Sequence, residues 1–319
     1  MDVIQTKIRH FLREDLSLDI PEDLSFLPPS SRLQLLNNAI ERFSFRIPFQ
    51  NILLMSEAPE LRRLPTLEEL VDDVVAGRGG LCYTNNTFFK YALEVLGFEA
   101  FHVAASVSQP HSHIIIGVRH VVQAGDCYLV EVGCGYPSFS AISMDFVRES
   151  PTLKDSFCTY KLVKKEGNDD GPYPTYERWQ RRDAVRVVAP ADIRGDDAAW
   201  FRFYDFMLEP RSLEHFRPYI GPLYENPPAR GPFHKMISMS QFPEGRGVTL
   251  KSVVVPKEDK SVRKLVLIAE QADGAAKKTE FLVDEEVQFR RAMETAGNLF
   301  PALREMIGKA FGNFEILEL

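Results

Sequence analysis

The sequence predicts an α+β protein of three units, because the chain is longer than one typical domain and its hydrophobic periodicity changes twice. Its 319 residues suggest about two or three domains. Apolar residues recur at helical spacing up to Gly97, alternate after it, and mix both patterns beyond residue 200. We therefore expect a helical unit over 1–97, an antiparallel sheet or barrel over 98–200, and a mixed unit over 201–319.

The composition is that of a globular protein and excludes several classes of partner. Apolar residues make up 45% and charged residues 26% of the chain, which excludes a disordered or collagen-like protein. With 38 basic and 45 acidic residues the net charge is −7, which argues against a nucleic-acid partner. No apolar run approaches the ~18 residues of a membrane helix, and charges interrupt residues 1–15, unlike a secretory signal. We expect a cytoplasmic protein with no membrane partner, and the oligomeric state stays open.

Three helices are expected in the first unit. Ser31 begins a capping-box sequence at the start of an apolar helical stripe, and Thr66 begins a second such sequence. Gly77 is suited to end the second helix. A third helix is expected over 82–96, ended by Gly97.

After Gly97 the alternation predicts strands joined by turns. A hairpin turn is expected at 123–126, and loops rich in Gly, Asp or Pro at 164–176 and 222–232. The expected strands of the middle unit are 99–107, 113–121, 127–133, 159–164 and 184–189. The last unit is expected to contain strands at 234–240, 248–255, 263–269 and 279–283, and helices at 284–295 and 300–311.

Cys82 is the strongest candidate for a reactive side chain. It follows the segment Arg78-Gly79-Gly80, whose glycines permit a sharp turn, and it opens the expected third helix. Unpaired N–H groups and the helix dipole stabilise a thiolate there, so Cys82 is a candidate nucleophile. The alternative is a small buried residue at a helix start; without a following Lys-Ser/Thr, the glycines do not form a P-loop. The remaining cysteines, which lack zinc-ligand spacing, are expected to be inert: Cys127, Cys134 and Cys158.

A thiol nucleophile requires a base and a group that orients the base, and two neighbouring strands supply candidates. His113 begins one strand, and Glu131 interrupts the next, where an unpaired carboxylate among apolar residues is costly. Because a hairpin joins the two strands, His113 and Glu131 can be cross-strand neighbours. The alternatives are a surface histidine, a charge on an edge strand, and Asp126 or Asp145 as the orienting acid.

At these residues the chain resembles the arylamine N-acetyltransferases, through four segments in the family's order. Residues 47–51, IPFQN, are similar to its I-P-F-E-N element, and 78–82 with Asn86 to its nucleophile motif R-G-G-x-C-x-x-x-N. Ser112-His113 and the aliphatic strand after them are similar to its catalytic-histidine strand. Residues 128–135, YLVEVGCG, are similar to its Y-L-V-D-V-G-F-G segment, with a weaker similarity at Pro232-Phe233.

The resemblance implies a helical bundle, a β-barrel and an α/β lid around a Cys-His-acid core like that of cysteine proteases. It implies a ping-pong reaction in which acetyl passes from acetyl-CoA, through an acyl-cysteine, to an arylamine or arylhydrazine, as in xenobiotic metabolism. By motif position Cys82 is the nucleophile, His113 the base and Glu131 the orienting acid, and no metal is needed. Acetyl-CoA is a co-substrate rather than a tightly bound cofactor, and its expected contacts are Gly133, Cys134, Gly135 and Phe233.

Three positions depart from the family's pattern. Glu131 stands where Asp is usual, Thr84 stands where Glu or Gln is usual, and Cys134 replaces a Phe, which opens space in the acyl pocket. Two other functions therefore stay open. One is a different Cys-His-Glu thiol acyltransferase or hydrolase; the other is a catalytically silent family member that acts in binding.

Overall fold

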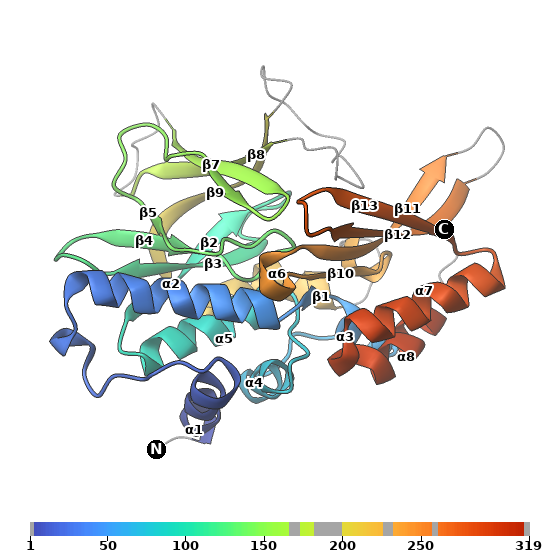
Figure 1. Cartoon of the computed structure of the whole chain (residues 1–319), viewed down its shortest axis with the longest axis horizontal. Helices are drawn as coiled ribbons and strands as arrows, with labels where there is room; N and C mark the ends of the chain where they lie inside the picture. Colours follow the sequence, from blue (N-terminus) through green and yellow to red (C-terminus); the bar gives the residue numbers. More distant parts are fainter. Residues whose placement is uncertain (1–2, 166–172, 182–199, 226–231, 257–260, 316–319) are drawn as a thin grey trace.

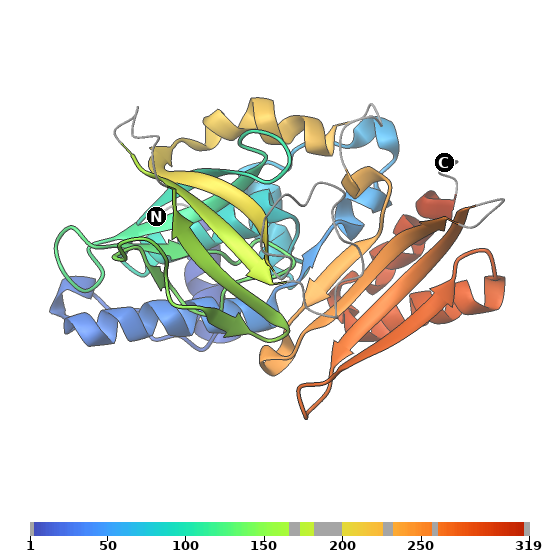
Figure 2. The same ribbon diagram turned by 90° about the horizontal axis from the view of Figure 1, so that it is seen from above.

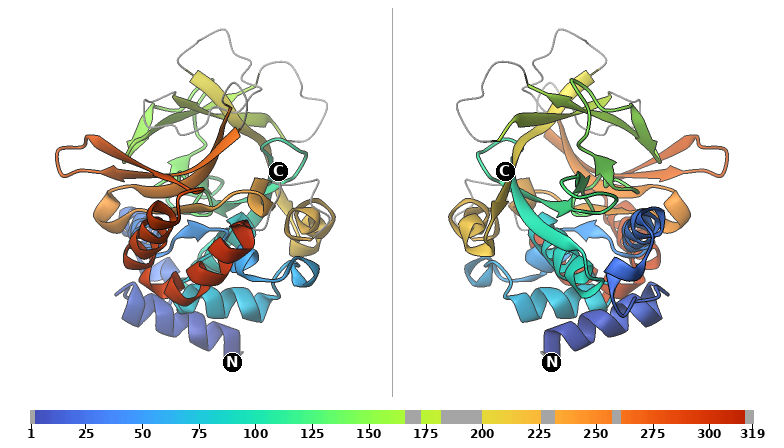
Figure 3. Two further views of the ribbon diagram at one scale, coloured as in Figure 1. Left: turned by 90° about the vertical axis from the view of Figure 1, so that its right-hand side faces the viewer. Right: turned by 90° about the vertical axis from the view of Figure 1, so that its left-hand side faces the viewer.

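A computed structural model describes residues 3–165, 173–181, 200–225, 232–256 and 261–315 (Figure 1). Helices lie beneath a curled eight-stranded sheet, and a five-stranded sheet with two helices of its own lies beside them (Figure 2). Seen end-on, the eight-stranded sheet arches over the helical layer (Figure 3). The predicted α+β class is confirmed, whereas the unit boundaries at residues 97 and 200 stay predictions.

Five α-helices precede the first long strand; the third lies beside the C-terminal helix, and the other four form the helical layer. Thr66 caps its helix through a reciprocal capping box with Glu69, as predicted, and Gly77 follows that helix with φ +74°. The predicted capping box at Ser31 is wrong, because the helix begins earlier, at Pro29, whose fixed φ suits the first helical position. The helices are α1 Val3–His10, α2 Pro29–Arg46, α3 Ile52–Ser56, α4 Leu67–Val75 and α5 Cys82–Val95.

The eight-stranded sheet is antiparallel throughout, in the order β5-β4-β3-β2-β9-β8-β7-β6. Its end strands β5 and β6 do not pair with each other within the described residues, so the predicted barrel is a half-barrel. The predicted strand 184–189 lies outside the described residues. The strands are β2 Glu99–Ser106, β3 His113–Arg119, β4 Cys127–Val130, β5 Ile142–Ser143, β6 Leu153–Asp155, β7 Cys158–Lys164, β8 Thr175–Arg181 and β9 Trp200–Arg211.

Strand β3 is buried on both faces and separates two cores. Ile114 and Ile116 pack in the core between the sheet and the helices, whereas Ile115 packs with Leu129 in the core inside the curl. This confirms the predicted alternation along 113–118. The same alternation directs the His113 side chain toward the inside of the curl, where its ring contacts Tyr204.

The five-stranded sheet takes its first strand from the N-terminal half of the chain. The two-residue strand β1, Phe49–Gln50, pairs with β10, Ser238–Gln241, and the order continues β11-β12-β13. Helices α7 and α8 cover one face and share its apolar core with α3. The predicted strand 234–240 begins later, since a short 3₁₀ turn occupies Pro232–His234. The other elements are β11 Val248–Pro256, β12 Ser261–Glu270, β13 Ala276–Leu282, α7 Glu286–Leu299 and α8 Arg304–Glu315.

Helix α6, Leu213–Tyr224, links the two sheets and was not predicted. It contains Pro218 and Pro222, and proline disfavours a helix interior because it lacks a backbone N–H to donate. Its apolar face nevertheless buries Phe216 and Ile220 in the core beneath the half-barrel. Within the described residues, no helix has the length and apolarity that crossing a membrane requires.

Candidate active site

Cys82 is the first residue of α5, and the turn before it can only be made by glycine. Gly79 has φ +61°, and a Cβ atom there would lie 2.1 Å from the carbonyl oxygen of Pro48. The N-cap residue Leu81 offers no side-chain cap, so the first N–H groups of α5 are left without a side-chain partner at the helix terminus. Cys82 is 8% exposed. The structure therefore places the thiol at the helix N-terminus that the sequence predicts.

The turn before Cys82 is held by strand β1. The side-chain amide of Gln50 donates to the carbonyl oxygens of Arg78 and Gly79, at 3.2 Å each, and its backbone N–H donates to Gly80 at 3.0 Å. Arg78 also forms an ion pair with Asp73 at 2.8 Å. Three backbone carbonyls in succession thus have fixed partners, which makes the approach to the nucleophile rigid.

Cys82, His113 and Glu131 lie in a buried row. Nε2 of His113 is 2.5 Å from Oε2 of Glu131, and the imidazole is also within hydrogen-bond reach of the Cys82 sulfur. Because the carboxylate occupies Nε2, Nδ1 is the nitrogen left for the sulfur. His113 is 4% exposed and Glu131 is fully buried. The structure brings the three predicted residues together.

The electrostatics of this row favour charged forms in spite of burial. Burial alone would lower the pKa of His113, but Glu131 and the Cys82 sulfur outweigh it and raise that pKa above its ordinary value. Burial alone would raise the pKa of Glu131, but His113, Arg178 and the amide of Asn86 lower it. At neutral pH the row therefore contains an imidazolium and a carboxylate, with the Cys82 sulfur beside the imidazolium.

Asn86 connects the helix of the nucleophile to Glu131, a role that its place in the motif did not predict. Its Nδ2 donates to Oε1 of Glu131 at 2.9 Å and to the carbonyl of Ile114 at 2.7 Å, while its Oδ1 accepts from the N–H of Val132 at 3.1 Å. Its spacing of four residues from Cys82, on one helix face, was the available signal. These bonds also explain why β4 ends at Val130 and not at the predicted residue 133: the N–H of Val132 and the carbonyl of Ile114 on β3 both bond the side chain of Asn86.

The four residues expected to contact acetyl-CoA differ in how closely they approach Cys82. Gly133 adjoins the nucleophile, since a Cβ atom there would lie 2.3 Å from Nδ2 of Asn86 and 3.1 Å from Cα of Cys82. Cys134 is buried, and its thiol donates to the carbonyl of Tyr136 at 2.9 Å. Phe49 connects the other two: it packs against the ring of Phe233 and lies 3.7 Å from the Cβ position of Gly135.

Neither alternative acid, Asp126 or Asp145, lies against His113. The carboxylate of Asp126 accepts hydrogen bonds from the backbone N–H groups of three loop residues, 121–123, and so closes the hairpin. Asp145 is exposed. Neither carboxylate contacts His113 within the described residues, so Glu131 is the carboxylate that the structure places against the imidazole.

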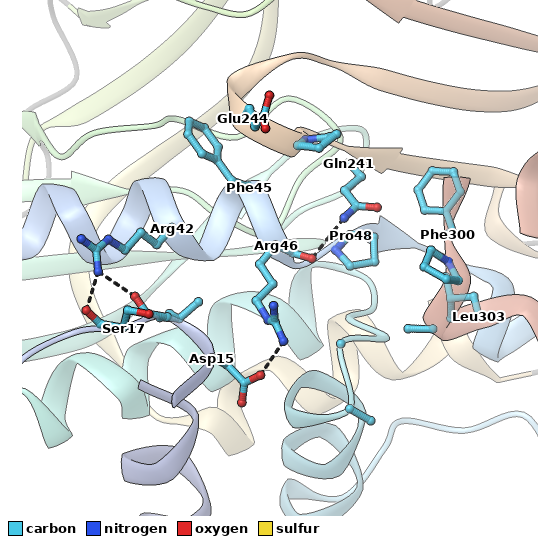
Figure 4. Close-up of a pocket in the computed structure, with 16 residues that line it drawn as sticks. Asp15, Ser17, Arg42, Phe45, Arg46, Pro48, Gln241, Glu244, Phe300 and Leu303 are labelled. Carbon is cyan, nitrogen blue, oxygen red and sulfur yellow. Dashed lines mark hydrogen bonds and ion pairs between the residues drawn. The ribbon is translucent and has the colours of Figure 1, made fainter. Parts of the chain in front are cut away.

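Two cavities lie near the nucleophile's turn. One, of about 630 Å³, reaches Gly80, Leu81, Thr84 and Tyr224. The other, of about 690 Å³, lies between α2 and the turns at 243–245 and 301–303, and no predicted site residue lines it (Figure 4). Arg42 and Arg46 on its wall are already bonded to the backbone of Leu16 and Ser17 and to Asp15. In the part of the chain described, no three His, Cys, Asp or Glu side chains gather as metal ligands would.

Comparisons with known proteins agree along most of the chain. A family model described as N-acetyltransferase matches residues 32–288. Human arylamine N-acetyltransferase 1 is 24% identical over 195 residues, which are 58% of this chain and 63% of the human protein, so the match spans less than two thirds of that relative.

Solved structures share the fold. The arylamine N-acetyltransferase from Mycobacterium abscessus superposes with a TM-score of 0.67 at 16% identity, over 97% of this chain and 95% of that one. An arylamine N-acetyltransferase from Bacillus cereus, whose structure reveals a unique Cys-His-Glu catalytic triad, superposes with a TM-score of 0.55 at 22% identity, over 82% and 92%. Since the family model covers most of its length, this chain belongs to the arylamine N-acetyltransferase family.

Proposed function

We propose that this protein transfers an acetyl group from acetyl-CoA to an aromatic amine or hydrazine, through an acyl intermediate on Cys82. The observation that carries the proposal is the buried row in which the His113 ring interacts with both Glu131 and the Cys82 sulfur. Family membership supports the acyl donor and the class of acceptor. The Cys-His-Glu triad described for the Bacillus cereus relative supports a glutamate as the orienting acid.

Acylation begins from the ion pair of the Cys82 thiolate and the His113 imidazolium. The thiolate attacks the thioester carbonyl, and N–H groups at the start of α5 are suited to stabilise the oxyanion that forms. As the C–S bond to CoA breaks, His113 gives its proton to the CoA sulfur. This leaves acetyl-Cys82 and a neutral imidazole that Glu131 holds in place.

Deacylation runs the proton transfer in reverse. The amine nitrogen attacks the acetyl carbonyl, and neutral His113 accepts a proton from that nitrogen. The C–S bond to Cys82 then breaks, the amide leaves, and the thiolate–imidazolium pair is restored. A ping-pong order follows, because CoA leaves before the amine reacts.

The direct test is intact-mass measurement after incubation with acetyl-CoA in the absence of an amine. We expect the mass to rise by one acetyl group, Cys82→Ala to stay unmodified, and an aniline to remove the adduct as the acetanilide. Cys127→Ala is the matched control and should acquire the same adduct.

Two outcomes of this experiment would replace the proposal. An adduct that disappears at the same rate with and without the aniline would indicate a thioester hydrolase. The lack of any adduct across a panel of acyl-CoAs, in a protein that binds them, would indicate a family member that acts by binding alone.

A further inference from the structure

Arg178 is the largest fully buried side chain among the described residues. It extends from β8 into the curl of the half-barrel, with its guanidinium 4.2 Å from the ring centroid of Tyr160 and 5.8 Å from that of Tyr204. Its Nη2 donates to the carbonyl of Tyr136 at 2.8 Å. A guanidinium is always charged at the pH at which proteins work, so the curl contains a permanent buried cation.

No carboxylate in the described part of the chain forms an ion pair with Arg178. Asp155 lies close by, but it is only partly buried, and it accepts hydrogen bonds from the N–H of Phe139 and the hydroxyl of Tyr160. The fully buried carboxylate nearby is Glu131, and Arg178 helps to lower its pKa against the effect of burial.

The packing places Arg178 beside the catalytic row. The ring of Tyr204 is a neighbour of both, with its centroid 5.4 Å from that of the His113 ring and 5.8 Å from the guanidinium carbon. The carbonyl of Tyr136 accepts from both Arg178 and the thiol of Cys134, three residues after Glu131. The segment that follows Glu131 is thus hydrogen-bonded to Arg178 through the carbonyl of Tyr136.

The charges of the buried row Cys82–His113–Glu131 are balanced only when the charge of Arg178 is added to them. In the starting state of the proposed mechanism the four side chains are a thiolate, an imidazolium, a carboxylate and a guanidinium, and their net charge is zero. After acylation the thioester and the imidazole are both neutral, and Glu131 faces Arg178 alone, again with net charge zero. Without Arg178 both states would carry one uncompensated negative charge, which is costly in a buried site.

We propose that Arg178 is a positioning residue for the reaction, whose buried guanidinium keeps Glu131 ionised while His113 is neutral. The proposal rests on the proposed function, since it concerns the same proton transfer. The uncharged neighbours do not change the balance, because burial raises the pKa of Cys134, Tyr160 and Tyr204 and keeps them protonated. The titratable and charged groups that face Arg178 and Glu131, besides the row itself, are Cys134, Asp155, Cys158, Tyr160 and Tyr204.

The test is the pH dependence of Cys82 alkylation by iodoacetamide, measured in the whole protein. The acid limb of this profile is the pH range in which the rate falls because the Cys82 thiolate becomes protonated. Removing a buried positive charge makes the thiolate easier to protonate, so in Arg178→Met the acid limb should move up by about one pH unit. Arg178→Lys keeps the charge and should leave that limb in place. The double variant Arg178→Met with Glu131→Gln restores neutrality and should bring the limb back toward its original pH.

A role in packing alone predicts a different pattern. It would lower the alkylation rate at every pH without moving the limb, and Glu131→Gln would not reverse it. Either result, or a limb that moves as far in Arg178→Lys as in Arg178→Met, overturns the proposal. The matched control is Arg202→Met on the neighbouring strand β9, a half-exposed arginine paired with Glu177 and Asp205, which should not move the limb.

The alkylation experiment stays decisive if Arg178→Met does not fold, and it tests the role of Arg178 separately from the proposed acetyl transfer. If Arg178→Met fails to fold, the charge argument requires the neutral double variant to fold, and a double variant that also fails overturns the proposal. Iodoacetamide replaces its iodide with the Cys82 sulfur without any acyl donor. The experiment therefore reports on Arg178 even if acetyl-CoA proves not to be the donor, a failure that the intact-mass test would detect.

Discussion

Glu131 has both of its oxygens engaged, and this gives its side chain one position. Oε1 accepts from Asn86 and from the N–H of Gly133, each at 2.9 Å, and Oε2 faces His113. In Glu131→Gln an NH₂ group must face one of these donors, and the charge is lost. We expect acylation of Cys82 to fall by up to ~10⁴-fold, measured in a single turnover.

The shorter acid is the control for this substitution. Glu131→Asp keeps the charge but withdraws it by one methylene, and a misplacement of about 1 Å costs up to ~10²-fold. The expected order of rates is therefore wild type, Asp, then Gln. A wild-type rate in Glu131→Gln, with an unchanged pH profile, would remove Glu131 from the mechanism.

The cysteines should differ widely in reactivity. Burial raises the pKa of Cys127 to about 11, and it raises that of Cys134 well above its ordinary value, so both are thiols at neutral pH. Cys82 lies beside an imidazolium whose pKa is raised, so this partner keeps its charge through neutral pH and above. Brief alkylation at about pH 7 with mass-spectrometric mapping should label Cys82 first. Equal labelling of the four cysteines would contradict an activated Cys82.

For single residues, the sequence predicted the candidate site side chains that belong to a motif, but it did not predict the buried Arg178 beside them. Cys82, His113 and Glu131 could be identified because a helix start and strand alternation place such residues predictably. Arg178 could not, because a lone arginine in a polar stretch is expected on the surface, and only the curl of the sheet brings it beside Glu131.

Two capping sequences allow a test at the level of one element. The side chain of Thr66 accepts from the N–H of Glu69 at the start of α4, whereas Ser31 lies inside α2 and caps nothing. Thr66→Ala should lower the free energy of unfolding by about 1 kcal/mol. Ser31→Ala should change it by less than about 0.5 kcal/mol. Urea denaturation of both variants checks the pair, and equal losses would restore the capping box predicted at Ser31.

Strand β8 shows why the sequence missed whole elements. Its buried positions are Tyr176, Arg178 and Gln180, so two of its three inward side chains are polar and the alternation is the reverse of the usual one. The predicted loop 164–176 therefore runs into a strand at Thr175. Strands β2 and β3 were predicted because their alternating positions are apolar on both buried faces.

For the whole molecule, the side chain of Asn51 connects the N-terminal half to the segment that leads into the C-terminal sheet. Its side chain donates to the carbonyls of Phe233 and Met236, and its Oδ1 accepts from the N–H of Ser238 at 2.8 Å. Asn51→Ala leaves the buried N–H of Ser238 and the two part-buried carbonyls without these bonds, and we expect a loss of about 2–4 kcal/mol in the free energy of unfolding.

Asn37 supplies the comparison for Asn51. Its side chain accepts one hydrogen bond, from the N–H of Ala141 at 2.9 Å. Asn37→Ala should therefore cost about 1 kcal/mol, measured by the same denaturation experiment. If Asn51→Ala costs no more than Asn37→Ala, the connection through Asn51 does not hold the two parts together.

Strand β1 also has a consequence for the order in which the protein is made. The turn before Cys82 is bonded to Gln50, and Gln50 lies in a two-residue strand whose sheet partner is β10, about 190 residues later in the chain. A two-residue strand is too short to persist without that partner. On the ribosome, we therefore expect Cys82 to react no faster than the other cysteines until residues 238–241 have emerged. Pulse alkylation of stalled nascent chains should show selective labelling of Cys82 only after β10 has left the exit tunnel.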